Sequence, residues 1–321
     1  MKERLWQELA RGAFILIDKP IGCTSSWITR NVLRMVSEKV GKKVRAGHHG
    51  TLDPACSGLL PVAVGSATKL LRFLNSDKEY AFTVKIGYET DSYDLDGVFV
   101  REVDMSHVTL KDVEAEVRRM VGVDIPQIPP LFSAKKVGGR RAHAIARQMR
   151  ERGGATTIEL PPKLVNIHEM RLVGFRPGSQ PEADIVMQCG AGTFVRSVAR
   201  DLGANLGGHA GTVTALRRTV GGGFKVDAAV PFCPNVNLAA ATVTMADAMA
   251  TCIPRAIEIS GSEHDTRSWA TRKFQHTGNI DDEREHLARV FLGKTFLGVG
   301  HHRHDHLRRV AHVVPLEEGF A

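Results

Sequence analysis

The chain has 321 residues, of which 43% are hydrophobic and 24% charged, as in an ordinary folded protein of about two domains. No stretch approaches the roughly 20 apolar residues of a membrane span, and the charged N-terminus lacks the apolar core of a signal peptide, so we expect a cytoplasmic protein. The formal net charge of +8 favours a polyanionic partner such as nucleic acid. Five scattered cysteines without a C-x-x-C pair predict reduced thiols.

The N-terminal part predicts a strand and a helix that lead into a glycine-rich loop. The apolar run 14–17 predicts a buried strand, and Thr24 is placed to cap the helix after it. A basic run, 39–45, precedes the loop 47–58, which reads G-H-H-G-T-L-D-P-A-C-S-G. The apolar stretch 59–64 then predicts a core strand, which would hold one end of this loop still.

Asp53 is the only acid between Glu38 and Asp77. A lone carboxylate in a rigid, otherwise uncharged loop is a candidate nucleophile or base. An Asp-Pro pair also initiates turns, and spacing alone favours this simpler interpretation. His48 and His49 suggest a metal site, but adjacent histidines diverge on a strand and no third ligand is obvious, so we expect no metal.

Residues 80–88 alternate between apolar and polar side chains and form the clearest predicted strand. Asp91, Asp94 and Asp96 follow it with a spacing that resembles part of a calcium loop. Such a loop needs glycine at its sixth position, which Asp96 occupies. We therefore expect a turn whose acids pair with basic loops.

The middle of the chain predicts a capped helix followed by a basic segment. Thr109 and Asp112 form a capping box for a helix that stops at Gly122, after which three prolines are expected to break regular structure. The segment 135–152 is rich in lysine and arginine. It is either a solvated face or a mobile arm that closes on phosphates.

A second strand is predicted at 183–189, and Thr193 is expected to cap the next helix. Arg196 in the first turn of that helix opposes the helix dipole, so it should have a carboxylate or phosphate partner. Apolar segments between 287 and 314 predict short strands of a small β-rich module. Strands of mixed length with helices between them indicate an α+β fold class.

Several short motifs follow one another in a fixed order along the chain. They are D-K-P at 18–20, G-H-H-G-T-L-D-P at 47–54, S-G-L-L-P at 57–61, G-Y-E-T-D-S-Y-D at 87–94, P-P-L-F-S-A-K-K at 129–136, G-T-F-V-R-S at 192–197 and L-R-R at 216–218. Together they make the chain resemble the bacterial tRNA pseudouridine-55 synthases, the TruB family.

The resemblance implies two domains. The first, at 1–250, would be a pseudouridine synthase catalytic domain with a mixed, mainly antiparallel sheet flanked by helices. Residues 129–165 would form its RNA-clasping insertion, in agreement with the basic segment. Residues 255–321 would form a small β-rich PUA-like domain that contacts RNA.

The resemblance further implies isomerisation of uridine to pseudouridine in the T-loop of tRNA. This reaction breaks an N-glycosidic bond and remakes it to carbon without net redox change or hydrolysis, so no cofactor is expected. Asp53 matches the family's essential aspartate, the nucleophile that acts on a flipped-out uridine. Tyr80 matches the tyrosine that stacks on the base, and Arg196 matches the arginine that pairs with the aspartate. The resemblance thus reverses the preference for a simple turn at Asp53.

Six further positions are expected to bind substrate, and the expected partner is the T-stem-loop of tRNA. Phe194 stands where the family often has tyrosine, which removes a hydroxyl near the substrate but keeps the stacking area. The six are His48, Leu216, Lys69, Phe194, Arg140 and Arg141.

We expect a monomer with no obligate protein partner. Two alternatives stay open. One is a synthase that depends on a guide RNA, and the other is an RNA chaperone without catalysis, which the composition and the basic segment fit equally well.

Overall fold

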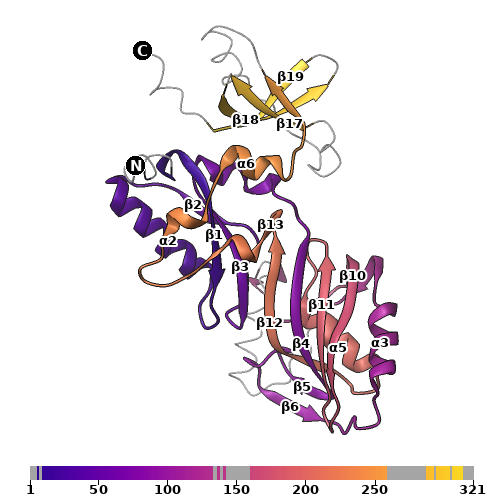
Figure 1. Ribbon diagram of the computed structural model, residues 1–321. Coiled ribbons are helices and arrows are strands. Elements are labelled where there is room, and N and C mark those ends of the chain that lie inside the picture. The colour runs from indigo at the N-terminus through magenta and orange to yellow at the C-terminus, as the bar shows by residue number, and fades with distance from the viewer. Residues whose placement is uncertain are drawn as a thin grey trace. The chain divides into compact units, whose positions relative to one another are not determined.

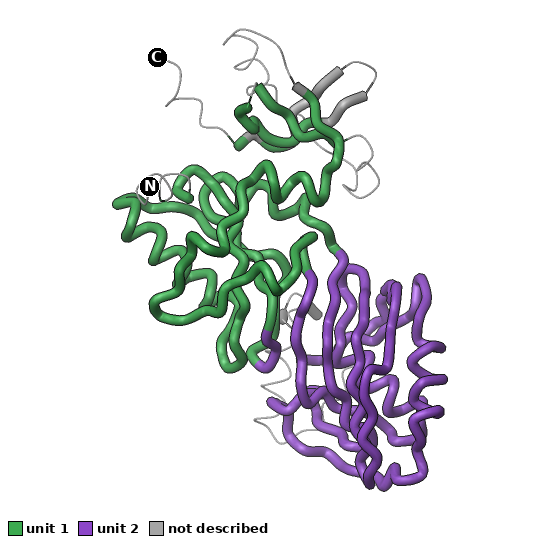
Figure 2. Tube along the Cα trace, in the orientation of Figure 1, with its two compact units in different colours: residues 1–54, 58–76, 221–321 green, residues 55–57, 77–220 purple. Residues whose placement is uncertain are grey.

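The computed structural model describes residues 6, 9–132, 136–137, 140–141, 160–258, 287–292, 294–303 and 306–313 (Figure 1). For 136–137, 140–141, 258, 301–303, 306–310 and 312 the description covers the backbone alone. The chain divides into two compact units, which Figure 2 shows in different colours. The first unit comprises residues 1–54, 58–76 and 221–321, and the second comprises residues 55–57 and 77–220.

The first unit is organised around β1 (Gly12–Lys19), whose apolar side chains are almost all buried. β1 pairs antiparallel with β3 (Cys56–Gly65), and β3 pairs antiparallel with β2 (Ala46–His48). Both predicted core strands, at 14–17 and 59–64, are therefore confirmed. They lie side by side, and the segment 49–55, which contains Asp53, connects β2 to β3.

Helix α2 (Ser25–Val40) packs against β2 and begins as predicted. The Thr24 hydroxyl accepts a hydrogen bond from the backbone N–H of Trp27 at 3.1 Å. The helix ends at Gly41, whose φ of 66° lies in the left-handed region that glycine adopts without strain. Its cap and its stop are thus both set by local sequence.

The remaining elements of the first unit precede the C-terminal strands. They are η1 (Ser66–Phe73), β13 (Phe224–Lys225), η2 (Val226–Ala228), β14 (Val230–Pro231), η3 (Leu238–Ala241), β15 (Thr242–Thr244) and α6 (Met245–Ala250). β14 pairs parallel and β15 antiparallel with β1, so this sheet is mixed.

The β-rich module near the C-terminus is a four-stranded sheet in the order β16-β17-β18-β19. Its strands are β16 (Ala256–Glu258), β17 (Leu287–Leu292), β18 (Thr295–Arg303) and β19 (His306–His312). The three strands predicted between 287 and 314 are confirmed. The PUA-like character of this module and the domain boundary between 250 and 255 stay predictions.

The second unit contains a sheet in the order β12-β4-β11-β10-β7. Its helix α5 packs on β4, and α3 packs on β10 (Figure 1). The bounds are β4 (Lys78–Ile86), α3 (Leu110–Arg119), β7 (Gly122–Gln127), β10 (Lys163–Arg176), β11 (Glu182–Cys189), α5 (Val195–Asn205) and β12 (Gly211–Gly221). Together with the first unit, this arrangement confirms the α+β class.

Two short hairpins complete the second unit. β5 (Tyr88–Thr90) pairs with β6 (Phe99–Glu102), and β8 (Lys136–Val137) pairs with β9 (Arg140–Arg141). The predicted strand 80–88 is shorter than expected because Gly87, with φ 76°, ends β4 and places Tyr88 in β5. Most of the basic segment 135–152 lies outside the described residues.

The prediction that the prolines after Gly122 break regular structure is wrong for Pro126. Pro126 lies within β7, which is the last strand of its sheet. An edge strand tolerates proline because one side of its backbone has no ladder partner to bond. β7 then leads directly into the segment 127–132, which contacts α5.

The capping box of α3 is confirmed: Thr109 Oγ1 accepts from the N–H of Asp112, and the Asp112 carboxylate accepts from the N–H of Thr109. Leu110 and Val121, the apolar residues at the two ends of this region, are 46% and 38% exposed. The helix ends at Arg119 before Val121 can complete the apolar face, and Leu110 occupies its first position.

Two findings bear on the excluded classes of protein. No helix among the described residues is long and apolar enough to cross a membrane. None of the five cysteines forms a disulfide bond, as their scattered spacing predicts.

Candidate active site

Asp53 is half-buried, and the residues on both sides of it, Leu52 and Pro54, are held by hydrogen bonds to their backbones. The Ser25 hydroxyl accepts from the N–H of Leu52 at 2.8 Å and donates to the carbonyl of the same residue at 3.0 Å. The carbonyl of Pro54 accepts from the N–H of Gly22 at 2.9 Å. The backbone that carries the Asp53 side chain therefore has little freedom to move.

Lys19 also contacts the segment around Asp53. Its side chain is fully buried, which is costly for an ammonium group unless carbonyls replace its water shell. Lys19 Nζ donates to the carbonyls of Pro20 at 2.8 Å, Cys23 at 2.9 Å and Pro54 at 3.5 Å. This ammonium group ties the end of β1 to the residue that follows Asp53.

His48 lies at the end of β2, and its side chain contacts α2, the same helix that holds the segment around Asp53. Its Nδ1 is 3.0 Å from Thr29 Oγ1, and the Thr29 hydroxyl proton is donated to the carbonyl of Ser25 at 2.9 Å. This contact joins the His48 ring to α2. The other ring nitrogen, Nε2, lies 3.4 Å from Thr51 Oγ1.

The neighbouring His49 points elsewhere, with Nε2 3.0 Å from the carbonyl of Asn75. This divergence agrees with the expectation for adjacent histidines in extended backbone. Within the part of the chain that the structure describes, no group of three His, Cys, Asp or Glu side chains could hold a metal ion.

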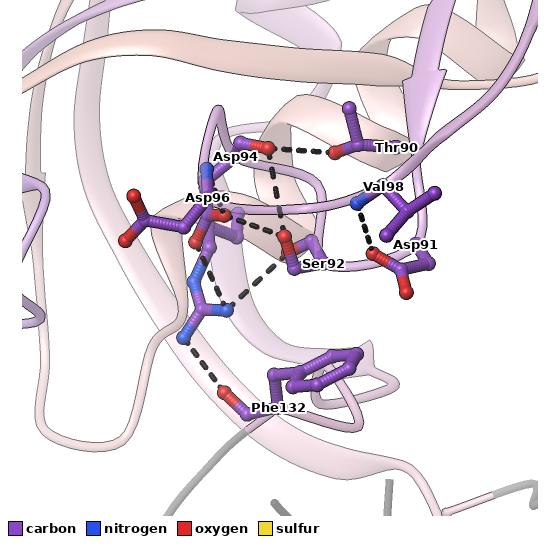
Figure 3. Close-up of polar contacts among 8 residues, drawn as sticks. Thr90, Asp91, Ser92, Asp94, Asp96, Val98 and Phe132 are labelled. Carbon is purple, nitrogen blue, oxygen red and sulfur yellow. Dashed lines mark hydrogen bonds and ion pairs between the residues drawn. The ribbon is translucent and has the colours of Figure 1, made fainter. Parts of the chain in front are cut away.

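Arg196, in the first turn of α5, is buried and held on several sides. Its Nη1 lies 3.3 Å from Asp94 Oδ2 and donates to the carbonyl of Ser92 at 3.3 Å, while Nη2 donates to the carbonyl of Phe132 at 2.9 Å. Figure 3 shows Ser92, Asp94 and Phe132 around this contact. The predicted carboxylate partner of a first-turn arginine is confirmed.

Asp94, which the sequence interpretation assigned only to a turn, is therefore part of this site. It lies between β5 and β6, and its carboxylate uses the two oxygens differently. Oδ1 accepts from the Ser92 hydroxyl and from the N–H of Asp96, whereas Oδ2 faces Arg196 (Figure 3). The expectation that these acids pair with basic loops is wrong for Asp94, because its partner is a helical arginine.

The turn around Asp94 contains strained and tightly packed backbone. Tyr93 has a φ of 60°, which costs a residue other than glycine about 1–3 kcal/mol. A Cβ at Gly97 would lie 2.3 Å from Ser92 Oγ, so only glycine fits there. Such a conformation persists only where surrounding contacts fix it, and here it directs Asp94 towards Arg196.

Tyr80 on β4 is 8% exposed and lies beside Arg218 of β12. Burial raises the pKa of Tyr80 to about 12, although the nearby Arg218 guanidinium, which hydrogen-bonds the phenol, acts in the opposite direction. Arg218 itself is fully buried. Beside this pair, Thr219 Oγ1 donates to Glu79 Oε1 at 2.7 Å and fixes the two strands locally.

Because its pKa is raised, Tyr80 stays a neutral phenol over the whole range in which the protein can be assayed. We expect the single-turnover rate between about pH 6 and 10 to show no ionisation of Tyr80. Unfolding should become easier as pH rises from about 10 to about 12, because only the unfolded tyrosine then loses its proton. A basic limb near pH 8 that disappears in Tyr80→Phe would contradict this.

The other predicted substrate-binding residues lie at these places. Lys69 is exposed on η1, Leu216 is half-buried on β12, and Phe194 is the half-buried N-cap of α5. The side chains of Arg140 and Arg141 on β9 lie outside the described residues.

The predicted site residues divide between the two units. Asp53, His48 and Lys69 belong to the first, and Tyr80, Phe194, Arg196 and Leu216 belong to the second. In the first unit, His48 and Asp53 lie on one short segment. In the second unit, Arg196 pairs with Asp94, and Tyr80 lies beside Arg218.

Sequence reasoning placed the cap of α5 incorrectly and missed two partners. Thr193 Oγ1 donates to the carbonyl of Gly190 and does not cap the helix. The sequence indicated that Arg196 needs an anion, but it did not single out Asp94 among the acids of the chain. Arg218 lies in the L-R-R motif, but nothing in its spacing indicates burial against Tyr80.

Comparison with known proteins places the chain among related sequences. The family described as "TruB family pseudouridylate synthase (N terminal domain)" matches residues 37–195. A protein from Synechococcus elongatus named tRNA pseudouridine synthase B is 44% identical over 218 residues, which covers 68% of this chain and 70% of that protein. A protein of the same name from Nostoc is 38% identical over 245 residues, or 75% and 79% of the two chains.

Two solved structures resemble the fold. One is entitled "Structure of H/ACA RNP bound to a substrate RNA containing 2'-deoxyuridine" and matches with a TM-score of 0.63, 16% identity and coverage of 97% and 88%. The other, a "Cbf5-Nop10-Gar1 Complex", matches with a TM-score of 0.61, 20% identity and coverage of 92% and 80%. At these identities the likeness shows the fold alone.

Proposed function

The chain belongs to the TruB family of pseudouridylate synthases, and we propose that it converts uridine to pseudouridine at position 55, in the T-loop of tRNA. Relatives that match two thirds of the chain carry the name tRNA pseudouridine synthase B, which supports tRNA as the substrate. The observation that carries the proposal is the fixed segment around Asp53, because a nucleophile must stay in place while the base is detached and turned.

In this proposal Asp53 is the nucleophile that acts on a flipped-out uridine. The bond from N1 of uracil to the ribose breaks, the base turns, and a bond from C5 to the same ribose carbon forms. The proton of C5 leaves and N1 gains one, so no atom is lost. A carboxylate can start this sequence at the ribose or at the base, and neither route needs a cofactor or a metal.

Tyr80 and Arg196 complete the proposed site. Tyr80 stacks on the base as a neutral phenol, and Arg196 keeps the reacting carboxylate ionised and directed. His48 and Leu216 hold the extruded nucleotide. Phe194, where the family often has tyrosine, keeps a stacking surface near it, and Lys69 contacts the RNA backbone.

The test is pseudouridine formation in a tRNA transcript that carries no modifications, detected by mass labelling. We expect conversion at position 55 by the purified protein without added protein, guide RNA or metal. A requirement for a guide RNA would favour the alternative synthase type. Binding without conversion would favour an RNA chaperone.

The proposal assigns the basic segment 135–152 to the tRNA backbone. Replacing Arg140, Arg141 and Arg147 with alanine should weaken tRNA binding. It should also reduce the magnitude of the slope of the log association constant against the log salt concentration by about 2 to 3, because each lost phosphate contact reduces that slope by about 0.7–0.9. Binding would be measured by titration at several salt concentrations.

The matched control removes the same charge from exposed arginines that already pair with glutamates. These are Arg101, Arg118 and Arg171, which pair with Glu89, Glu114 and Glu169. Their replacement should leave the slope unchanged. Equal slopes for both triple variants would mean that the basic segment is only a solvated face.

A further inference from the structure

Helix α5 begins without a side-chain cap of its own, although its first turn carries Arg196. Phe194 is the N-cap residue, and its side chain makes no capping hydrogen bond. The backbone of Phe194 is bonded instead by a distant side chain. Its N–H donates to Gln127 Oε1 at 2.8 Å, and Gln127 Nε2 donates to its carbonyl at 3.3 Å. We call this reciprocal pair the Gln127 clamp.

The residues after Gln127 continue along the first turns of α5. The carbonyl of Ile128 accepts from Ser197 Oγ at 2.7 Å and from Arg200 Nη1 at 3.2 Å. The carbonyl of Phe132 accepts from Arg196 Nη2 at 2.9 Å. Three residues of the segment 127–132, namely Gln127, Ile128 and Phe132, thus bond to the N-cap and the first turns of α5, and the Gln127 clamp is the first of these contacts.

We propose that Gln127 is a positioning residue for Arg196: it fixes the start of α5 and thereby the direction of the Arg196 guanidinium. This inference rests on the proposed function, in which Arg196 takes part in the reaction. Gln127 acts through the backbone of Phe194, because it bonds the N–H and the C=O of this residue, which lies two positions before Arg196.

The chemistry explains why glutamine occupies this position. A primary amide carries one acceptor oxygen and a donor nitrogen, so it can bond both backbone polar groups, the N–H and the C=O, of one residue. Methionine has similar length but neither group, and glutamate has no donor when ionised. Gln127 is only 4% exposed, so removing its amide leaves polar backbone groups of Phe194 without a side-chain partner in a largely buried place.

Packing alone does not hold this segment. A cavity of about 380 Å³ lies beside it, lined among others by Gln127, Ile128 and Val198. Without the hydrogen bonds, the start of α5 could shift towards this space. A shift of about 1 Å in a reacting group can cost about 10²-fold in rate.

The first experiment compares Gln127→Met with the wild-type protein. We expect kcat for pseudouridine formation to fall about 10- to 100-fold while KM for tRNA changes less than about threefold. Gln188→Met is the matched control, because the exposed Gln188 bonds Glu79 on the neighbouring strand and should change kcat less than about twofold. A loss that appears only in KM would overturn the proposal.

A double-mutant cycle separates positioning from general destabilisation. If Gln127 acts through Arg196, then Gln127→Met should cost less than about threefold in single-turnover rate once Arg196→Lys is present. If the two losses multiply, Gln127 does not act through Arg196 and the proposal is overturned.

Amide hydrogen exchange tests the Gln127 clamp without reference to activity. Exchange at residues 194–198 should be faster in Gln127→Met than in the wild-type protein, and exchange in α3 should be unchanged. Equal exchange at 194–198 would overturn the clamp even if the variant is slow. Absence of pseudouridine with wild-type protein would instead overturn the proposed function and, with it, the role given to Gln127.

Discussion

Asp53→Asn is expected to lower the rate of pseudouridine formation by more than about 10⁴-fold while tRNA binding is retained. Asparagine has the size of aspartate and keeps one acceptor oxygen, but it cannot carry the negative charge of a nucleophile. The hydrogen bonds that fix this segment belong to Leu52 and Pro54, so the substitution leaves them in place. The loss should therefore lie in chemistry and not in folding.

The measurement is a single-turnover time course with enzyme in excess over an unmodified tRNA transcript, followed by mass-labelled detection of pseudouridine. Binding is measured separately at the same salt concentration, since affinities for nucleic acid depend on salt. Asp104→Asn makes the same chemical change at an exposed turn and should leave both quantities within about twofold of wild type. Conversion by Asp53→Asn at a rate near wild type would refute the role of Asp53.

The sequence predicts those features that depend on neighbouring residues. The cap of α2 by Thr24 and the capping box at Thr109 each need only three or four consecutive positions, and both are confirmed. The buried strands β1 and β3 follow from short apolar runs. Such local signals do not depend on where the rest of the chain lies.

Features that depend on distant partners could not be predicted. β10 was not expected, because its exposed and buried positions do not alternate regularly and its pairing with β11 contains two irregularities. Arg196 called for an anion, but its spacing could not choose among the acids of the chain. The partner is Asp94, which lies about a hundred positions before Arg196 in the sequence. Asp94 belongs to a turn whose conformation depends on Tyr93 and Gly97.

The same limit applies to the groups that hold the functional backbone. Ser25 bonds both polar groups of Leu52, next to Asp53, and Gln127 bonds both polar groups of Phe194, near Arg196. Both side chains are buried and neither lies near its partner in the sequence. A serine at the start of a helix and a glutamine before prolines have ordinary explanations, so only the fold indicates these roles.

Asp94→Asn is expected to lower kcat by about 10²-fold with little change in KM for tRNA. Asparagine can accept the hydrogen bonds of Ser92 and Asp96, but it removes the charge that faces Arg196. The side chains of Arg196 and Asp94 are only 6% and 10% exposed, so water cannot compensate for the lost partner. The guanidinium would keep its bonds to the carbonyls of Ser92 and Phe132 but lose the group that sets its direction.

Stability must be measured beside activity, because removing one member of a buried ion pair costs about 3–5 kcal/mol of unfolding free energy. Kinetics would therefore be recorded at a temperature where thermal unfolding shows the variant to be folded. Asp96→Asn is the matched control: it removes the same charge from the same turn, but its side chain is exposed and should have no effect on kcat beyond about twofold. If the two variants reduce kcat equally, the turn contributes only its net charge. If only Asp94→Asn reduces kcat, then the position of Arg196 depends on the Asp94 carboxylate in particular, in agreement with the ion pair between these two side chains.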